Sequence, residues 1–555
     1  MNDRDPGPWP MGVPRHLEVP ERSVAANLAL TAAREPKRTA TIFYGGRLSY
    51  GDLARQVDAL AGWLRHEAGV ARGDRVLLCM QNSPHYVIGY YAILRADAVV
   101  VPVNPMNRAG EMRHLADDTG ARVALAGTDV VDVLAPLLAD GALASVLAAD
   151  YAGMADPAEG PPLPVALARP LPDPLPPGVV RWRDALAADL APGESVAGPD
   201  DLAVIPYSSG TTGRPKGCMH THRTVMTTLM GSLAWNPQGL GHATLVALPL
   251  FHVTGMQNSM NAPVAAGETM VLMARWDRRL AAELIRRHRV TRWRSISTMA
   301  IDLVNDPDLD PADLSSLRMI GGGGAAMPDS VARRLKEITG LHYIEGYGLS
   351  ETMAATHINP VDAPKRHCLG IPVFDVDARV VDPDTLVELG PDQPGEIVVS
   401  APQVFVGYWN QPEATAAVFF ERDGKRFLRT GDIGRVDAEG YFHIVDRLKR
   451  MINVSGFKVW PTEVEGLIHD HPDVAEVCVV GRPDARRGER VRACVVTRGA
   501  RDADALIAWC RTRMAAYKVP SDVIFLDALP RSPSGKVMWR DLTADAAAEA
   551  DIAPA

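Results

Sequence analysis

Apolar residues recur along the first two thirds of the chain in two alternating patterns. Residues 50–66 and 86–94 carry them at helical spacing, and residues 75–80 form a short apolar strand between these helices. Further strands are predicted at 202–207, 244–248, 269–273 and 317–320, and further helices at 279–288 and 329–339. Because helices separate the strands, the pattern predicts an α/β fold with parallel sheets.

The pattern changes after residue 370. Shorter apolar strands with turn residues between them predict a small β-rich, barrel-like module over residues 370–446. Beyond residue 447 the spacing predicts a compact α+β unit whose first helix begins at Pro461. We therefore expect an N-terminal domain over residues 1–447 and a small C-terminal domain over residues 448–555.

Residues 134–198 are rich in alanine, leucine, aspartate and proline. The prolines between residues 161 and 177 interrupt any long periodic element, because each proline removes a backbone donor and fixes its own φ angle. We expect this stretch to be an excursion on the surface of the N-terminal domain.

Charge and cysteine content narrow the possible functions. The 555 residues carry a net charge of −9, so no general attraction to nucleic acid or to an anionic membrane is expected, and a polyanionic ligand must be bound locally. Six cysteines lack Cys-x-x-Cys spacing, which argues against a disulfide framework and a zinc ribbon. The N-terminus has no signal-like apolar core, and the most apolar stretch, residues 86–103, contains Arg95 and Asp97. We expect a soluble, cytoplasmic protein.

The strongest chemical signal lies at residues 207–217, which read Tyr-Ser-Ser-Gly-Thr-Thr-Gly-Arg-Pro-Lys-Gly between a predicted strand and a predicted helix. Phosphate groups bind short hydroxyl donors, backbone N–H groups freed by glycine, and a cation. The segment supplies all three through Ser209, Gly210, Thr211, Thr212 and Lys216. It is not a Walker A loop, because proline precedes the lysine and glycine follows it.

This loop resembles the phosphate-binding signature of the adenylate-forming (AMP-binding) enzymes, the family of acyl-CoA synthetases, luciferases and nonribosomal-peptide adenylation domains. Further family signatures follow in the same order, at residues 251–255, 345–352, 429–432, 446–449, 454–458 and 530–536. The resemblance covers about residue 25 to residue 542. It implies a two-lobed α/β N-terminal part and a mobile C-terminal domain.

The resemblance also implies a nucleotide site for ATP. Gly346 and Tyr347 would lie against adenine, Asp432 would accept hydrogen bonds from the ribose hydroxyls, and Arg447 would assist at the ribose and phosphate. Glu351 would hold Mg²⁺, and the Thr352 hydroxyl would touch the α-phosphate. Glu351 and Thr352 are therefore expected among the catalytic residues.

Lys536 resembles the catalytic lysine of the family. Its charge would bridge the substrate carboxylate and the α-phosphate and stabilise the transition state. In the second half-reaction, Ser455, Gly456 and Phe457 would line the tunnel for CoA, and Lys449 would mark the hinge of the C-terminal domain. The arginines at 482, 486, 487, 490 and 492 could attract the 3′-phosphate of CoA, although a run of charges is more often a solvated face.

The resemblance places the acyl pocket at His252, Met256 and the run Gly322, Gly323 and Gly324. Residues 252–262 contain no charged side chain, which disfavours amino acids and dicarboxylates and favours an apolar acid. A medium- or long-chain fatty acid is our first hypothesis. An aryl-acid CoA ligase and an acyl-adenylate ligase that loads a carrier protein stay open, as does a homodimeric state. One departure from the family pattern concerns pocket shape: Ile296-Ser297-Thr298 lacks the usual proline.

Two weaker signals compete with this interpretation. Gly321-x-Gly323-x-x-Ala326 formally satisfies a dinucleotide fingerprint, which would indicate an NAD-dependent oxidoreductase. Cys218, His220 and His222 look like a metal cluster, but on a helix these positions point to different faces. A non-catalytic nucleotide-binding protein is a further alternative, against which the intact Glu351, Asp432 and Lys536 argue.

Overall fold

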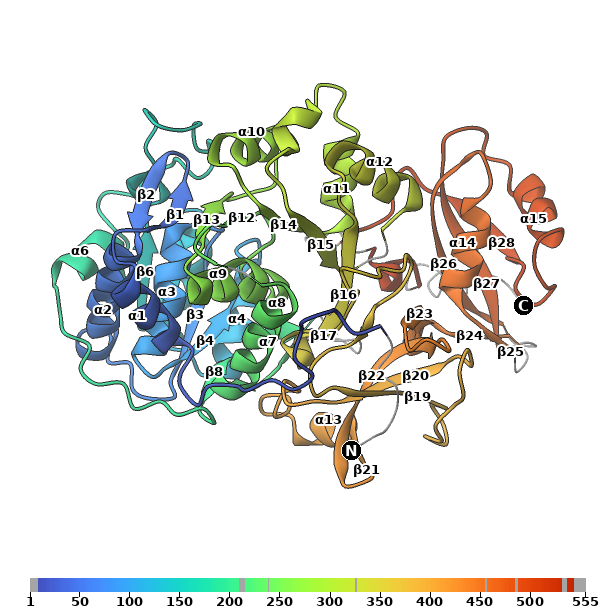
Figure 1. Cartoon of the computed structure of the whole chain (residues 1–555), viewed down its shortest axis with the longest axis horizontal. Coiled ribbons are helices and arrows are strands. Elements are labelled where there is room, and N and C mark those ends of the chain that lie inside the picture. The colour runs from blue at the N-terminus through green and yellow to red at the C-terminus, as the bar shows by residue number, and fades with distance from the viewer. Residues whose placement is uncertain are drawn as a thin grey trace. The chain divides into compact units, whose positions relative to one another are not determined.

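The computed structural model describes residues 8–208, 215–237, 239–324, 327–454, 457–484, 488–531 and 537–543 (Figure 1). The chain divides into two compact units. Unit 1 contains Met1–Asp377 and Val399–Leu428, and unit 2 contains Ala378–Val398 and Arg429–Ala555.

Unit 1 contains a nine-stranded sheet. Its strand order is β18-β17-β16-β15-β14-β12-β13-β1-β2. The inner strands from β1 to β16 are parallel, whereas β2, β17 and β18 pair antiparallel at the edges. The strands are β1 (Thr39–Phe43), β2 (Gly46–Ser49), β12 (Ala243–Val246), β13 (Thr269–Leu272), β14 (Arg292–Ser295), β15 (Met319–Gly323), β16 (Tyr343–Leu349), β17 (Ala354–Ile358) and β18 (Ile371–Pro372).

A seven-stranded sheet follows the order β11-β8-β4-β3-β5-β6-β7 and is parallel except at β11. Its strands are β3 (Arg75–Cys79), β4 (Val99–Pro102), β5 (Val123–Gly127), β6 (Ser145–Ala149), β7 (Val179–Arg181), β8 (Leu202–Val204) and β11 (His220–Thr221). A separate antiparallel pair joins β9 (Tyr207–Ser208) to β10 (Lys216–Gly217). The two sheets confirm the predicted α/β class.

The helices of unit 1 cover both faces of both sheets. They are α1 (Ala25–Arg34), α2 (Tyr50–His66), α3 (Pro84–Arg95), α4 (Ala109–Thr119), α5 (Val131–Ala139), η1 (Tyr151–Met154), α6 (Trp182–Ala187), α7 (His222–Trp235), α8 (Val253–Gly255), η2 (Met256–Asn261), α9 (Ala262–Ala266), α10 (Arg278–His288), α11 (Ser297–Val304), η3 (Pro311–Leu314), α12 (Asp329–Thr339), η4 (Ser350–Thr352) and α13 (Pro412–Ala416).

Three clusters of buried apolar residues hold the sheets and helices of unit 1 together. The core between the sheets contains residues of α1, α2, α3, α7 and α9. Because strand side chains alternate, Met270 of β13 enters this core while Val271 packs with α10, α11 and α12 on the other side. On the seven-stranded sheet, Leu77 of β3 packs with α4 and α5 in a third cluster. Helices on both faces are what parallel sheets require.

The predicted surface excursion at residues 134–198 is wrong in part. Residues 145–149 form β6 and residues 179–181 form β7, which are two strands of the seven-stranded sheet. Val146 and Leu147 are fully buried. A strand buried on both faces shows no alternation of polar and apolar residues, so its short Ala-rich sequence gave no strand signal. Most of the irregular chain lies between η1 and β7.

A five-stranded sheet occupies the predicted β-rich region. Its order is β19-β20-β22-β21, and β23 pairs with β22. The strands are β19 (Asp377–Val381), β20 (Gly395–Ser400), β21 (Phe419–Arg422), β22 (Lys425–Val436) and β23 (Phe442–Arg447). Over the described residues the pairing does not return to the first strand, so this sheet is open and not a closed barrel.

The rest of unit 2 is a second five-stranded sheet with helices. Its order is β25-β24-β27-β26, and β28 pairs with β27. The elements are η5 (Leu448–Arg450), β24 (Ile452–Val454), β25 (Phe457–Val459), α14 (Pro461–His469), β26 (Val474–Asp484), β27 (Gly488–Thr497), α15 (Ala503–Arg511) and β28 (Asp522–Phe525). This agrees with the predicted small α+β unit.

The six cysteines all lie within the described residues, and none forms a disulfide. All of them are buried, as expected of ordinary reduced thiols. Among the helices that the structure describes, we find none with both the length and the apolar character needed to span a membrane.

Candidate active site

Three residues from distant parts of unit 1 meet where the phosphate loop ends. The Tyr408 hydroxyl donates a hydrogen bond of 2.8 Å to Oε1 of Glu351. The Lys216 ammonium lies 5.0 Å from the centre of the Tyr408 ring, within range of a cation–π contact. Burial and the neighbouring Glu351 raise the pKa of Tyr408, so its hydroxyl stays a donor at neutral pH. The sequence interpretation named Lys216 and Glu351 but missed Tyr408.

Backbone pairing brings these residues together. Met219 N donates to Gly407 O at 3.0 Å, and Val406 N donates back to Met219 O at 2.9 Å. Lys216 itself pairs with Ser208 across the β9–β10 ladder. Residues 209–214, which include Ser209, Gly210, Thr211 and Thr212, lie outside the described residues. The described part therefore places only Lys216 of the predicted phosphate loop, and a groove of about 520 Å³ runs past the neighbouring Tyr408.

Glu351 lies on a single turn, η4, that is held from several sides. The backbone N–H of Phe405 donates to Glu351 O at 2.9 Å, and the buried imidazole of His220 bonds Ser350 O at 2.7 Å. Burial lowers the pKa of His220 to about 4, so the ring is neutral and donates through Nε2. Met353 and Ala354 follow with φ angles of 49° and 89°, a strained backbone of the kind that functional sites retain.

Thr352 supports this turn. Its hydroxyl accepts a hydrogen bond from Leu349 N at 2.9 Å and donates one to Ala354 O at 2.8 Å, and the residue is fully buried. The hydroxyl hydrogen of Thr352 is thus already bonded to the backbone next to the turn. This geometry favours a positioning role beside Glu351 over the predicted contact of the hydroxyl with the α-phosphate.

The predicted adenine contact lies on β16. Tyr347 is half-buried, and its ring centre is 5.6 Å from that of His357. Gly346 precedes it and pairs with Gly323 of β15 in parallel register. Oε1 of Glu345 accepts a hydrogen bond from Met327 N at 3.0 Å, and burial raises the pKa of this carboxyl. The structure therefore brings Gly323, Gly346 and Tyr347 together on neighbouring strands.

In unit 2, the predicted ribose contact Asp432 is almost fully buried and pairs in register with Arg447 across β22 and β23. The turn before it is fixed by Glu396, which bonds the Arg429 guanidinium at 2.6 Å and accepts from Gly431 N at 3.0 Å. Gly431 has a φ of 70°, a conformation that favours glycine. The predicted pair of Asp432 and Arg447 is therefore adjacent in the backbone of one sheet.

Other predicted residues of unit 2 are only partly described. The backbone of Lys449 lies in η5 and that of Phe457 lies in β25. Ser455, Gly456 and Lys536 lie outside the described residues.

The arginine run expected to attract CoA is largely paired. Arg492 bonds Asp522 at 2.7 Å, Arg482 lies 3.3 Å from the same carboxylate, and Arg490 lies 4.0 Å from Asp484. Arg486 and Arg487 lie outside the described residues. Acidic partners inside unit 2 thus already neutralise the described arginines.

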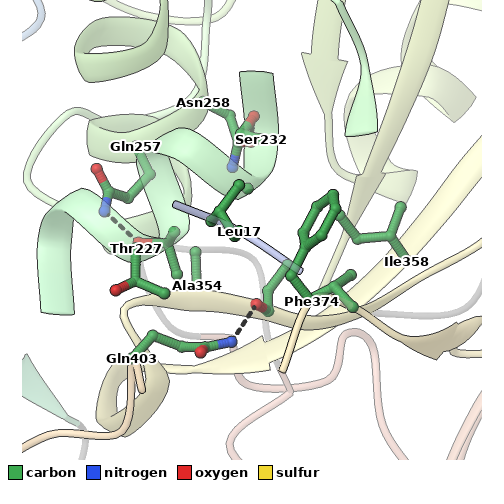
Figure 2. A pocket seen from close by; sticks show the side chains of 13 residues that line it. Leu17, Thr227, Ser232, Gln257, Asn258, Ala354, Ile358, Phe374 and Gln403 are labelled. Carbon is green, nitrogen blue, oxygen red and sulfur yellow. Dashed lines mark hydrogen bonds between the residues drawn. The ribbon is translucent and has the colours of Figure 1, made fainter. Parts of the chain in front are cut away.

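A small cavity lies beside β17, the strand that follows the Glu351 turn in sequence (Figure 2). Its volume is about 30 Å³, and its walls come from α7, from η2, from β17 and from residues 373–374. Gln257 and Asn258 line it, whereas the predicted Met256 is fully buried in the core between the sheets. His252 is exposed and caps α8, accepting from Thr254 N at 3.4 Å. The cavity was not predicted, because its walls come from distant segments.

The predicted glycine run lies next to a buried cation that the sequence interpretation overlooked. Arg294 of β14 is 8% exposed, and its Nη1 lies 3.1 Å from where a Cβ on Gly321 would stand. Within the described residues its guanidinium forms no hydrogen bond or ion pair. Burial lowers its pKa to about 10, so it is charged at neutral pH. A buried charge without a partner is costly, which points to a role in binding.

The weaker signals take structural roles. Gly321, Gly322 and Gly323 lie within β15, whereas a dinucleotide fingerprint needs its glycines in the turn after the strand. His220 bonds Thr224, and His222 accepts from Val24 N at 3.0 Å. No group of metal-ligating side chains occurs in the described ranges of the chain. The hydrogen bonds of His220 and His222 give these two side chains structural roles in unit 1.

Glu351 is nevertheless suited to bind the Mg²⁺ ion that accompanies a nucleotide. Mg²⁺ uses one or two carboxylates together with water and substrate phosphates, and Glu351 has one oxygen bonded to Tyr408 and a second that no described donor occupies. Such an ion would neutralise phosphate charge.

The chain is similar in sequence to known proteins over most of its length. Residues 28–409 match the family described as AMP-binding enzyme, and residues 463–536 match the AMP-binding enzyme C-terminal domain. A long-chain-fatty-acid–CoA ligase of Bacillus subtilis is 34% identical over 96% of this chain and 97% of its own. A feruloyl-CoA synthase of Amycolatopsis is 37% identical over 91% of this chain and 96% of its own.

Two solved structures are similar to this chain over most of its length. ATP-bound MatB from Rhodopseudomonas palustris has a TM-score of 0.82 at 29% identity and covers 94% of this chain and 98% of its own. A fatty acyl CoA synthetase of Mycobacterium tuberculosis has a TM-score of 0.73 at 28% identity, with 95% of this chain and 99% of its own covered.

Proposed function

The chain belongs to the family of AMP-binding enzymes and is an AMP-forming acid–thiol ligase, and from that premise we propose that its acid is a medium- or long-chain fatty acid. Such an enzyme joins the carboxylate to AMP, releases pyrophosphate, and then transfers the acyl group to CoA. No covalent intermediate on the protein is needed, so the residues position the reactants and stabilise charge.

The observation that carries the proposal is the cavity between η2 and β17. Both walls continue from predicted site segments, η2 from His252–Gly255 and β17 from the Glu351 turn. An acid adenylated beside Glu351 would therefore direct its tail between these elements. None of the side chains that line the cavity carries a formal charge. An uncharged cavity favours an aliphatic tail.

The proposed roles follow from the contacts in unit 1. Glu351, held by Tyr408, would bind the Mg²⁺ that accompanies the nucleotide, and Lys216 would contact its phosphates. Lys536 is proposed as the group that bridges carboxylate and α-phosphate, and Ser455, Gly456 and Phe457 as the CoA contacts. The domain boundary at residue 447 and the hinge at Lys449 are part of the same proposal. A cytoplasmic location and a homodimer stay predictions from the sequence.

Arg294 favours a second candidate, an aryl acid with oxygen substituents. A guanidinium stacks on aromatic rings and donates to oxygen atoms, and Arg294 lies beside the glycine run assigned to the acyl pocket. The similarity to a feruloyl-CoA synthase supports this alternative.

One experiment separates the two candidates. AMP release that depends on CoA is measured for saturated acids from butanoate to palmitate and for benzoate, cinnamate and ferulate, with the wild type and with Arg294→Met. The fatty-acid proposal predicts the highest kcat/KM for octanoate or a longer acid and little change in Arg294→Met. A preference for ferulate that Arg294→Met abolishes would overturn it. A holo carrier protein offered in place of CoA tests the acceptor.

A further inference from the structure

The N-terminal segment, residues 8–20, passes α7 and β17 on its way to α1 in unit 1 (Figure 1). It precedes α1 and contains no helix or strand over its described length. Leu17 reaches the cavity from this segment. Figure 2 shows Leu17 with Gln257 and Asn258 on one side and Phe374 and Ile358 on the other. The segment therefore forms one wall of the cavity, and the other walls come from residues between 227 and 403 of unit 1.

Leu17 and Phe374 limit the size of this space. A Cβ placed on Gly231 of α7 would stand 3.5 Å from the Phe374 ring and 3.9 Å from Cδ2 of Leu17. The glycine thus provides room that these two side chains fill. The remaining volume of about 30 Å³ has room for only about two or three water molecules. A chain of many methylene groups cannot enter unless a wall moves.

Leu17 is the wall that can move with the least disruption. Phe374 packs edge-on against Trp235 of α7, with ring centres 5.7 Å apart. Leu17 is half-buried and is supported mainly by Asp375, which accepts from Leu17 N at 3.3 Å and bonds the exposed His16 ring at 2.8 Å. Exposed pairs of this kind contribute little to stability.

Trp9 provides the second attachment of the segment. Its ring packs edge-on against Trp235 at 5.0 Å and against Phe374 at 5.5 Å. Met11, between the two attachments, is 89% exposed. The segment is thus held at Trp9, at Met11, whose backbone N–H donates to Asp362 Oδ2 at 3.4 Å, and at residues 16–17. None of these points lies in a helix or strand, so Leu17 can shift without unfolding an element.

We propose that Leu17 is the removable floor of the acyl cavity, and that the N-terminal segment thereby sets the length of the acyl chain that the enzyme accepts. The inference rests on the proposed function, because it treats the cavity as the end of the acyl site. Short acids bind with Leu17 in place. Longer acids displace Leu17 and extend past α7 toward the surface.

The test compares profiles of kcat/KM against acid length, from butanoate to palmitate, for the wild type and three variants. Leu17→Ala enlarges the cavity and should shift the profile to longer acids, by about four-fold for each methylene group that becomes buried. Leu17→Trp should shift it to shorter acids. Val19→Ala is the matched control, since Val19 lies on the same chain but packs against the core and not the cavity.

A fourth variant leaves the floor side chain unchanged. Asp375→Gly removes the carboxylate that accepts from Leu17 N and bonds the His16 ring. Glycine tolerates the φ of 56° at this position. It should raise kcat/KM for long acids relative to short ones. Thermal unfolding of each variant shows whether a lost activity reflects a lost fold.

The outcomes separate the two proposals. Unchanged length profiles in Leu17→Ala and Leu17→Trp, with aliphatic acids activated by all proteins, would overturn the floor and leave the proposed function intact. If only aryl acids are activated, the proposed function fails, and the same variants are then compared on 4-alkoxybenzoates of graded length. A shift in that series supports the floor, and its absence overturns it.

Discussion

Replacing Tyr408 by phenylalanine removes one hydroxyl and tests how Glu351 is positioned. The hydroxyl donates to Glu351 Oε1 at 2.8 Å, and Tyr408 is 8% exposed, so little water can replace it. The ring would keep its edge-on contact with Phe405, whose centre is 4.8 Å away, so the fold should be retained. The expected effect is therefore on the orientation of one carboxylate.

The size of the effect follows from the charge on the acceptor. A hydrogen bond to a charged group contributes about 1.5–3 kcal/mol, and Glu351 is only half-buried, which places the loss near the lower end. A loss of about 1.5 kcal/mol corresponds to roughly a ten-fold fall in kcat/KM for ATP. Pyrophosphate release at saturating acid and varied MgATP measures it directly.

Tyr151→Phe serves as the matched control. Its hydroxyl also bonds a carboxylate, Asp129, at 3.1 Å, but it lies in the core between the sheets. This variant should lose stability and keep its kcat/KM for ATP. If Tyr408→Phe keeps the wild-type value, or if both variants lose activity equally, the proposed positioning of Glu351 is refuted.

Three further predictions address the remaining groups. Lys536→Ala should lower the rate of adenylation by about two to three orders of magnitude while thioester formation from preformed acyl-adenylate largely survives, and equal loss of both steps would count against it. Glu351→Gln should raise the Mg²⁺ concentration needed for half-maximal adenylation; an unchanged response excludes Glu351 as the ligand. Burial lowers the pKa of His85 to about 3, so its neutral form stabilises the fold fully above pH of about 6.5, and this contribution is lost as the pH falls toward 3. Between pH 7.5 and pH 5 the unfolding free energy should therefore fall by about 2 kcal/mol less in His85→Phe than in the wild type. Identical pH dependence of the two proteins in thermal unfolding would contradict this.

Several elements were predictable because their signals are local. Residues 50–66 and 329–339 have clear amphipathic spacing, and their ends carry a Ser49 cap and a left-handed Gly340. The motif residues Lys216, Tyr347, Glu351 and Asp432 could be proposed from the sequence, because each lies in a short segment that resembles a family signature.

The residues that were missed depend on contacts between distant segments. Tyr408 meets Glu351 across 57 positions of sequence, so no local pattern reveals the pair. Arg294 lies in the stretch Arg-Trp-Arg-Ser, which suggests an exposed face, but all four residues of this strand are buried in the folded chain. Leu17 lines a cavity with β17, more than three hundred residues away.

The ligase activates its acid by joining it to AMP before the thiol attacks. One carboxylate oxygen attacks the α-phosphorus, pyrophosphate leaves, and the thiol then displaces AMP by breaking the bond between the acyl carbon and that oxygen. Palmitate labelled with oxygen-18 in both carboxylate positions is incubated with the enzyme, MgATP and CoA, and AMP is analysed by mass spectrometry. One labelled oxygen is expected in each AMP released. Label in inorganic phosphate, or unlabelled AMP alongside palmitoyl-CoA, would contradict it.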